Sequence, residues 1–227
     1  MDPLDTVFRH LDRWRHFPSY QLERRADIFL SVYLKEVVED FTGVGLEDEI
    51  IPELPIKHEQ NCQSDKVDYA LFAKDRSQVF FVELKTDAAS RRDEQDAYLA
   101  RAKGMGFRRV VEGIHAILAS TNEHQKYHHL AVELARLGYF RVPVDLEDYT
   151  YPRPRTGLAS RLRKIEVAAV DSKVEVIYVQ PEATDGDLCI DFARFAECVS
   201  KHTDPLSKSF ADHLQKWRSV AGASKPR

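Results

Sequence analysis

Two apolar runs rich in β-branched and aromatic residues flank a short polar break in the first half of this chain. The first run is 67–72 and the second is 79–86. Runs of this kind, joined by a few polar residues, predict a β-hairpin. Three ionisable residues interrupt the runs: Asp68, Glu83 and Lys85. A charge within an otherwise buried strand is costly unless it is paired, hydrogen-bonded or bound to metal, so these residues need a structural or chemical reason.

The length of the hairpin loop decides whether the three charges share a face. Side chains alternate along a strand, so Glu83 and Lys85 point the same way. An even loop, such as the four residues 74–77, would place Asp68 opposite Glu83 on that face. An odd loop without a bulge would instead place Asp68 opposite Leu84 on the other face. The pattern therefore predicts an even loop or a compensating bulge.

An aspartate, a hairpin-sized gap and then Glu-x-Lys form a pattern that resembles the PD-(D/E)XK nuclease superfamily. Val67 stands where that superfamily frequently has a proline. Downstream, Gln95 and Tyr98 resemble the glutamine and tyrosine that follow the lysine in several nuclease families, where the commonest spacing is one residue longer. The resemblance covers roughly residues 20–100. It implies an α/β, restriction-endonuclease-like fold with a central mixed β-sheet of about four to five strands flanked by helices.

The resemblance also implies a chemistry, which is Mg²⁺-dependent hydrolysis of phosphodiester bonds, with Mn²⁺ able to substitute. Asp68, Glu83 and the Leu84 backbone carbonyl would hold the metal, because Mg²⁺ prefers hard oxygen ligands. Lys85 would position or deprotonate the attacking water and stabilise negative charge. Gln95 would orient Lys85 or a phosphate oxygen.

A long amphipathic helix is expected from Tyr20 to Phe41, after a Ser19 cap and before a glycine-rich stop. Alternation of strand direction places the first half of this helix nearer the acidic end of the sheet, where Glu23 or Asp27 would supply a third carboxylate. Members of the resembled superfamily often supply a helix glutamate here, which favours Glu23 as the holder of a second ion or a water. The alternative is an ordinary solvated acid in a first helical turn.

Basic and aromatic residues mark two segments that could contact the phosphates of a nucleic acid, most simply DNA. The alternative for each segment is a solvated surface. The residues are Arg91, Arg92 and Tyr98 in the expected helix 88–103, and Arg153, Arg155, Arg161, Arg163 and Lys164 in a proline-interrupted stretch.

The remaining periodicities predict a helix within 1–16, a strand at Glu49–Lys57, helices at 107–119, 123–137, 191–202 and 205–220, and a hairpin of 165–170 with 173–180. Two prolines give the strand at 49–57 an edge or bent character. Residues 139–148 are expected to be irregular.

Length and composition favour one globular domain over 1–227, with a helical extension at 1–18 and a flexible tail at 221–227. The chain has 227 residues, is 43% hydrophobic and carries a net charge of −4. Its three cysteines lack metal-ligand spacing, so reduced thiols and a cytoplasmic location are expected. Neither a membrane span nor a secretory signal is expected. A homodimer is left open.

Two other functions compete with the nuclease. One is a non-catalytic module on the same fold that binds nucleic acid or protein. The other is metal binding by His124 and His128, which have the i, i+4 spacing of a helical ligand pair. For Asp68, Glu83 and Lys85 themselves, the alternative is a cross-strand ion pair without catalysis.

Overall fold

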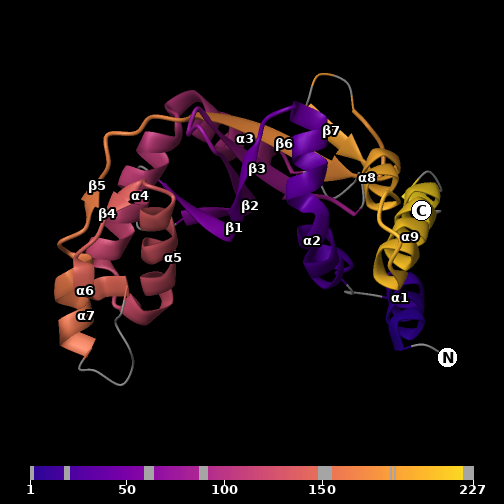
Figure 1. Cartoon of the computed structure of the whole chain (residues 1–227), viewed down its shortest axis with the longest axis horizontal. Coiled ribbons are helices and arrows are strands. Elements are labelled where there is room, and N and C mark those ends of the chain that lie inside the picture. Colours follow the sequence, from indigo (N-terminus) through magenta and orange to yellow (C-terminus); the bar gives the residue numbers. More distant parts are fainter. Residues whose placement is uncertain are drawn as a thin grey trace. The chain divides into compact units, whose positions relative to one another are not determined.

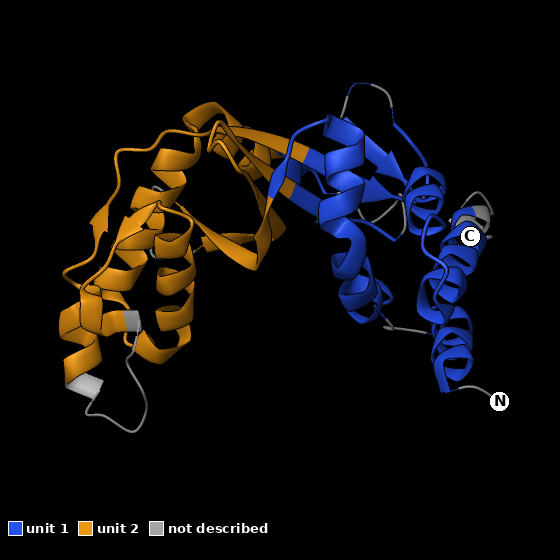
Figure 2. Cartoon of the chain, viewed as in Figure 1, with its two compact units in different colours: residues 1–46, 82–96, 177–227 blue, residues 47–81, 97–176 orange. Residues whose placement is uncertain are grey.

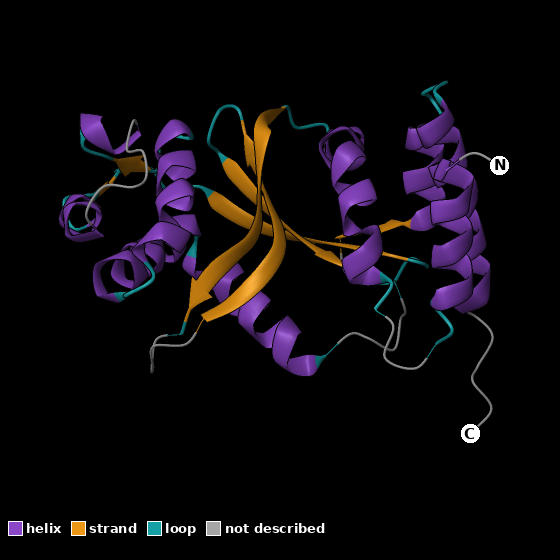
Figure 3. Ribbon diagram, turned by 90° about the horizontal axis from the view of Figure 1, so that it is seen from below, coloured by secondary structure: helices purple, strands orange, loops and turns teal. Residues whose placement is uncertain are grey.

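The computed structural model describes residues 3–17, 21–58, 64–86, 92–147, 155–184, 186 and 188–221. It has an α/β fold in which a five-stranded mixed sheet is flanked by helices, as the sequence predicts (Figures 1 and 3). The strand order is β1-β2-β3-β6-β7. These strands are β1 (Leu46–Lys57), β2 (Ser64–Ala73), β3 (Gln78–Leu84), β6 (Lys173–Gln180) and β7 (Leu188–Asp191).

The chain divides into two compact units (Figure 2). Unit 1 contains residues 1–46, 82–96 and 177–227, and unit 2 contains residues 47–81 and 97–176. Each unit is therefore built from segments that are distant in the sequence. Strands β3 and β6 begin in unit 2 and end in unit 1.

The loop between β2 and β3 confirms the prediction of an even loop. Strand β2 ends at Ala73 and β3 begins at Gln78, which leaves four residues, 74–77. Within this turn the Arg76 amide donates to the Ala73 carbonyl (2.8 Å), and Arg76 has a positive φ of 59°. The Ser77 hydroxyl and amide donate to the Asp75 carboxylate and hold its pKa below the ordinary value. The turn is thus stabilised by its own polar side chains.

Strand β1 lies at the edge of the sheet, in agreement with its two prolines, which cannot donate a backbone hydrogen bond. Glu53, between those prolines, has a positive φ of 53°, an uncommon conformation for a residue with a side chain. An edge strand tolerates this irregularity because only one of its sides pairs with a neighbour.

Unit 1 is built around four helices, α1 (Pro3–Trp14), α2 (Glu23–Thr42), α8 (Phe192–Val199) and α9 (Pro205–Ala221). Helix α9 packs against α1 and α8, and α2 packs against α8. Phe210 of α9 lies at the centre of the aromatic core, with its ring centroid 5.9 Å from Phe8 and 5.8 Å from Tyr33. Helix α2 ends at Gly43 in the left-handed conformation, as its sequence predicts, while Ser19 lies outside the described residues.

Unit 2 contains helix α3 (Asp93–Met105) from residue 97 onward, α4 (Phe107–Ser120), α5 (His124–Arg136), α6 (Val144–Glu147) and α7 (Arg155–Leu162). Its core includes the rings of Phe72, Phe107 and Tyr139. The predicted helices at 107–119 and 123–137 are confirmed. Residues 87–91, where the expected helix 88–103 was to begin, lie outside the described residues.

The predicted hairpin of 165–170 with 173–180 is wrong. Residues 166–167 form β5, which pairs antiparallel with β4 (Phe140–Arg141) in a separate two-stranded sheet, so 139–148 is not wholly irregular. Strand β6 instead lies between β3 and β7 and runs parallel to β7. The link between β5 and β6 is attached to the β2–β3 turn, because Ser172 Oγ donates to the Arg76 carbonyl and the Lys173 amide donates to the Ser77 carbonyl.

None of the helices in the described part of the chain is long and apolar enough to cross a bilayer.

A test of the unit 1 core concerns Asp12 of α1. Its carboxylate accepts the Trp217 indole N–H (2.6 Å) and lies 3.2 Å from His213 Nε2. We expect Asp12→Ala to lower the free energy of unfolding by about 1–3 kcal/mol, because the buried indole N–H loses its acceptor. Urea denaturation measures the loss, with Arg9→Ala, an exposed site on the same helix, as the matched control. Equal stabilities of the two variants would contradict this role of Asp12.

A second test concerns Glu175 of β6, which is buried between Lys103 (2.7 Å) and Lys173. Burial raises the pKa of Glu175, but the hydrogen bonds and charges of the two lysines outweigh it and hold the pKa below 4.5. The carboxylate therefore stabilises the folded state above pH 4.5, and this contribution is lost as the pH falls through the folded pKa. We expect Glu175→Gln to be less stable than wild type at neutral pH, with the difference shrinking in acid. Urea denaturation across pH checks this, and a pH-independent difference would contradict it.

Candidate active site

The charged residues at the end of β3 form a buried cluster within unit 1. The Glu83 carboxylate has 0% of its surface exposed and Lys85 has 4%. Lys85 Nζ lies 3.4 Å from Glu83 Oε2. The amide Nε2 of Gln95, in the first turn of α3, donates to the same oxygen. An ammonium, an amide and a carboxylate therefore meet at one point.

This burial explains why the cluster needs several donors. Removing a carboxylate from water costs several kcal/mol, which a single ion pair offsets only when the geometry is good and further hydrogen bonds complete it. Gln95 provides such a bond at Glu83. Since apolar residues of similar volume would serve stability as well or better, the pair indicates selection for something besides stability.

Strand β6 bonds to Lys85 and to the residue that follows Gln95, the two residues that donate to Glu83. The Lys85 amide donates to the Val179 carbonyl at 2.8 Å, which fixes the main chain just beyond β3. The neighbouring Tyr178 hydroxyl donates to Asp96 Oδ1 at 2.6 Å, next to Gln95 in the chain. The sequence interpretation missed Tyr178 and Asp96. The available signal was a lone hydroxyl in a strand as apolar as β6, because a buried tyrosine usually finds a hydrogen-bond partner.

The other predicted metal ligands lie on the elements where the sequence placed them. Asp68 is half-buried on β2, and Leu84 is the buried last residue of β3. Glu23 is half-buried at the first position of α2, and Asp27 follows one turn later. Glu23 belongs to the same unit as Glu83, whereas Asp68 belongs to unit 2. That Asp68 and Glu23 act together with Glu83 stays a prediction.

The donor chemistry of the cluster is compatible with Mg²⁺. Across the residues that the structure describes, no group of three or more His, Cys, Asp and Glu side chains gathers as a metal site. Magnesium is usually held by only one or two carboxylates, with water and substrate completing its octahedron. Glu83 supplies one such carboxylate within unit 1, and the second, from Asp68, stays a prediction.

The histidine pair on α5 has a different environment. His128 is buried, and its Nε2 lies 2.7 Å from the Leu146 carbonyl. A ring nitrogen that hydrogen-bonds a backbone carbonyl carries its proton there and cannot also bind a metal at that atom. This contact gives His128 a role in attaching α5 to α6 and weakens the metal-pair interpretation with His124.

The predicted phosphate-contacting residues fall into several groups. Arg92, Arg163 and Lys164 are exposed. The Arg161 guanidinium instead pairs with Asp145 (Nε to Oδ2, 2.6 Å) and lowers the pKa of that carboxyl. The Tyr98 hydroxyl donates to the Lys66 carbonyl at 2.9 Å. Arg91 and Arg153 lie outside the described residues, and so does the side chain of Arg155.

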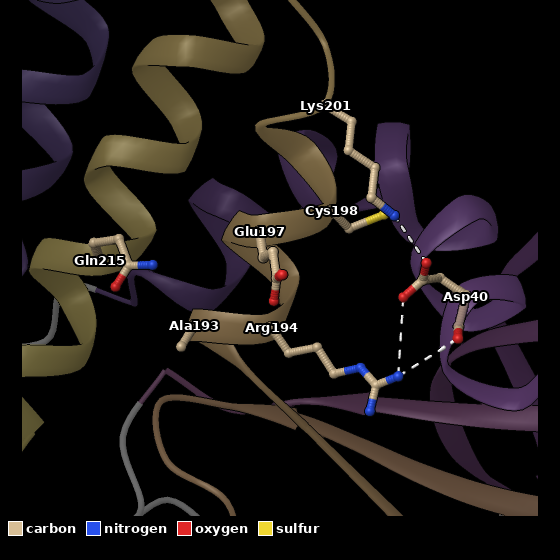
Figure 4. A pocket seen from close by; sticks show the side chains of 7 residues that line it. All are labelled: Asp40, Ala193, Arg194, Glu197, Cys198, Lys201 and Gln215. Carbon is tan, nitrogen blue, oxygen red and sulfur yellow. Dashed lines mark hydrogen bonds and ion pairs between the residues drawn. The ribbon is translucent and has the colours of Figure 1, made fainter.

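A hollow elsewhere in unit 1 has a different character (Figure 4). Asp40 lies in its wall and pairs with Lys201 (2.8 Å) and Arg194 (3.9 Å). The Cys198 thiol is buried, which with the nearby Glu36 carboxylate raises its pKa to about 11, so it is protonated at neutral pH. The lining residues are Asp40, Ala193, Arg194, Glu197, Cys198, Lys201 and Gln215. Because Asp40, Arg194 and Lys201 pair with one another and the Cys198 thiol is protonated, this hollow is a weaker candidate than the Glu83 cluster.

No protein-family model matches the chain, and comparison with curated proteins and with solved structures finds no significant match.

The cluster makes a prediction about stability. We expect Lys85→Met and Glu83→Leu each to lower the free energy of unfolding by about 3–5 kcal/mol, because each leaves a buried charge without its partner. The double variant should recover most of that loss, since no buried charge remains. Urea denaturation measures all three proteins.

Lys66→Met is the matched control, because Lys66 and Glu53 form an exposed pair (2.7 Å) whose loss should cost under about 1 kcal/mol. A double variant as unstable as the single variants would mean that the Glu83–Lys85 pair exists for stability.

Proposed function

We propose that this protein is a metal-dependent nuclease that hydrolyses phosphodiester bonds in DNA, in a restriction, repair or defence role. The observation that carries the proposal is the fully buried Glu83 carboxylate, held by Lys85 and Gln95 at the end of a sheet strand. The carboxylate and the cation match the Glu-x-Lys part of the PD-(D/E)XK pattern, and the amide matches the glutamine that follows the lysine in several of its families. Cys189 and Cys198, the two cysteines within the described residues, are thiols rather than members of a disulfide, which fits a cytoplasmic setting.

Each residue of the cluster has a distinct role in the proposed reaction. Glu83 and Asp68, with the Leu84 carbonyl, are the proposed ligands of Mg²⁺, which when bound would polarise the phosphate and lower the pKa of a coordinated water. As the ammonium, Lys85 positions the attacking water and stabilises charge on the phosphate, and only its neutral amine form could take the proton of that water. Gln95 orients the Glu83 carboxylate through its hydrogen bond.

Burial of the Lys85 ammonium strengthens its electrostatic interaction with a bound phosphate. A charge in a site shielded from water interacts more strongly with a phosphate than one at the surface. Lys85 is fixed through its own main chain and through its ion pair with Glu83, so little reorganisation is needed when substrate arrives. Glu23 is the proposed third carboxylate, and Arg92, Arg163 and Lys164 are proposed phosphate contacts because their side chains are exposed.

The competing function is a non-catalytic module that binds nucleic acid or protein. The presence of Asp68, Glu83 and Lys85 together favours the nuclease, because a module that only binds has no chemical need to retain all three residue types.

Cleavage assays test the proposal. We incubate the protein with circular single-stranded DNA, duplex DNA and RNA, each with Mg²⁺, Mn²⁺ or EDTA. We expect cleavage with Mg²⁺ or Mn²⁺ and none with EDTA. Lys85→Ala and Asp68→Asn should each reduce the rate by about 100-fold or more, the scale of a lost catalytic group.

The control variant is Lys126→Ala, which removes an exposed lysine of α5. Thermal unfolding confirms that each variant is folded before its rate is compared. Undiminished cleavage by both site variants would refute the assignment, and absence of cleavage by the wild type on every substrate would favour the binding module.

A further inference from the structure

We propose that Tyr178 of β6 is a positioning residue for the candidate site. Its hydroxyl holds Asp96, and through Asp96 it sets the first turn of α3 so that Gln95 reaches Glu83. The consequence for catalysis rests on the proposed nuclease function, whereas the positioning itself does not.

The first turn of α3 couples Asp96 to Gln95 directly. The amides of Gln95 and Asp96 both donate to the Arg92 carbonyl, at 2.9 and 3.1 Å, so the two residues belong to one rigid turn. Consecutive residues of a helix point about 100° apart around its axis. Fixing Asp96 against β6 therefore also fixes the direction in which the Gln95 side chain leaves the helix.

The contact from β6 is short, and the tyrosine that makes it is buried. The Tyr178 hydroxyl lies 2.6 Å from Asp96 Oδ1, and Tyr178 is only 4% exposed. A hydrogen bond to an ionised acceptor is stronger than one between neutral groups. A phenylalanine would fill the same space without burying a hydroxyl, so the hydroxyl is the part of Tyr178 that needs an explanation.

Through Val179, the residue after Tyr178, β6 also holds Lys85, so this strand supports both residues that donate to Glu83. The Val179 carbonyl accepts the Lys85 amide at 2.8 Å, one residue after Tyr178. Lys85 is thus held through its main chain, and Gln95 is held through Tyr178 and Asp96. Outer contacts of this kind that orient metal-ligating groups typically change metal affinity or activity by about 10- to 100-fold when they are removed.

Tyr178→Phe tests the inference, with Tyr33→Phe as the matched control. Tyr33 is also a buried tyrosine of unit 1, and its hydroxyl lies 2.9 Å from Ser207 Oγ, outside the proposed machinery. The first readout is the Gln95 side-chain amide signal in a ¹⁵N–¹H NMR spectrum, assigned by its absence in Gln95→Ala. We expect this signal to move toward the position of an exposed glutamine in Tyr178→Phe and to stay in place in Tyr33→Phe.

The second readout is the cleavage rate as a function of Mg²⁺ concentration. Tyr178→Phe should lower the rate or the apparent Mg²⁺ affinity by about 10-fold, the lower end of the range for such outer contacts. Because Tyr178 acts through Gln95, Tyr178→Phe should cause little further loss in a Gln95→Ala background. Asp96→Ala, which breaks the same contact from its other side, should reproduce the effect.

An unmoved Gln95 signal in both Tyr178→Phe and Asp96→Ala would overturn the inference, as would a full additional loss in the double variant. If the wild type cleaves no substrate, the proposed function fails, and the NMR comparison alone still decides whether Tyr178 positions Gln95.

Discussion

The fully buried carboxylate of Glu83 is the constraint on which the described part of the site depends. A charge at that depth must be met by donors, and they come from separate parts of the chain: Lys85 just beyond β3, and Gln95 on α3. Both are in turn held by β6, at Val179 and Tyr178. This dependence explains why β6 must lie next to β3 in the sheet, although more than eighty residues separate these strands in the sequence.

The features that the sequence predicts well are those fixed by local periodicity. The 3.6-residue period identifies α2, and Gly43 marks its end because it adopts a left-handed conformation. The apolar runs around Asp68 and Glu83 identify β2 and β3, and the polar residues 74–77 give the even loop. Each of these signals lies within about twenty residues of the chain, so no long-range information is needed.

The errors arise where distant partners decide the structure. Asp171 and Ser172 have the composition of a tight turn, which favoured a hairpin, but Ser172 bonds to Arg76 of the distant β2–β3 turn. Strands as short as β4 and β5 carry too few residues to show a period at all. The Tyr178–Asp96 contact joins residues 82 apart, so neither local sequence reveals the other. The resemblance identifies Gln95, but the Tyr178–Asp96 contact beside it is visible only in the folded structure.

Unit 1 is assembled from three separate segments of the chain, which affects how it folds during synthesis. Its segments include residues 1–46 and 177–227, and α1 packs against α9, so this unit can close only after α9 has been synthesised. Until then Glu83 has no β6 beside it and remains hydrated. Contacts between residues so distant in sequence slow folding. The apolar helix faces therefore stay exposed to solvent for longer, which favours aggregation. Truncation from the C-terminus should therefore remove the buried cluster entirely, rather than leave a weakened version of it.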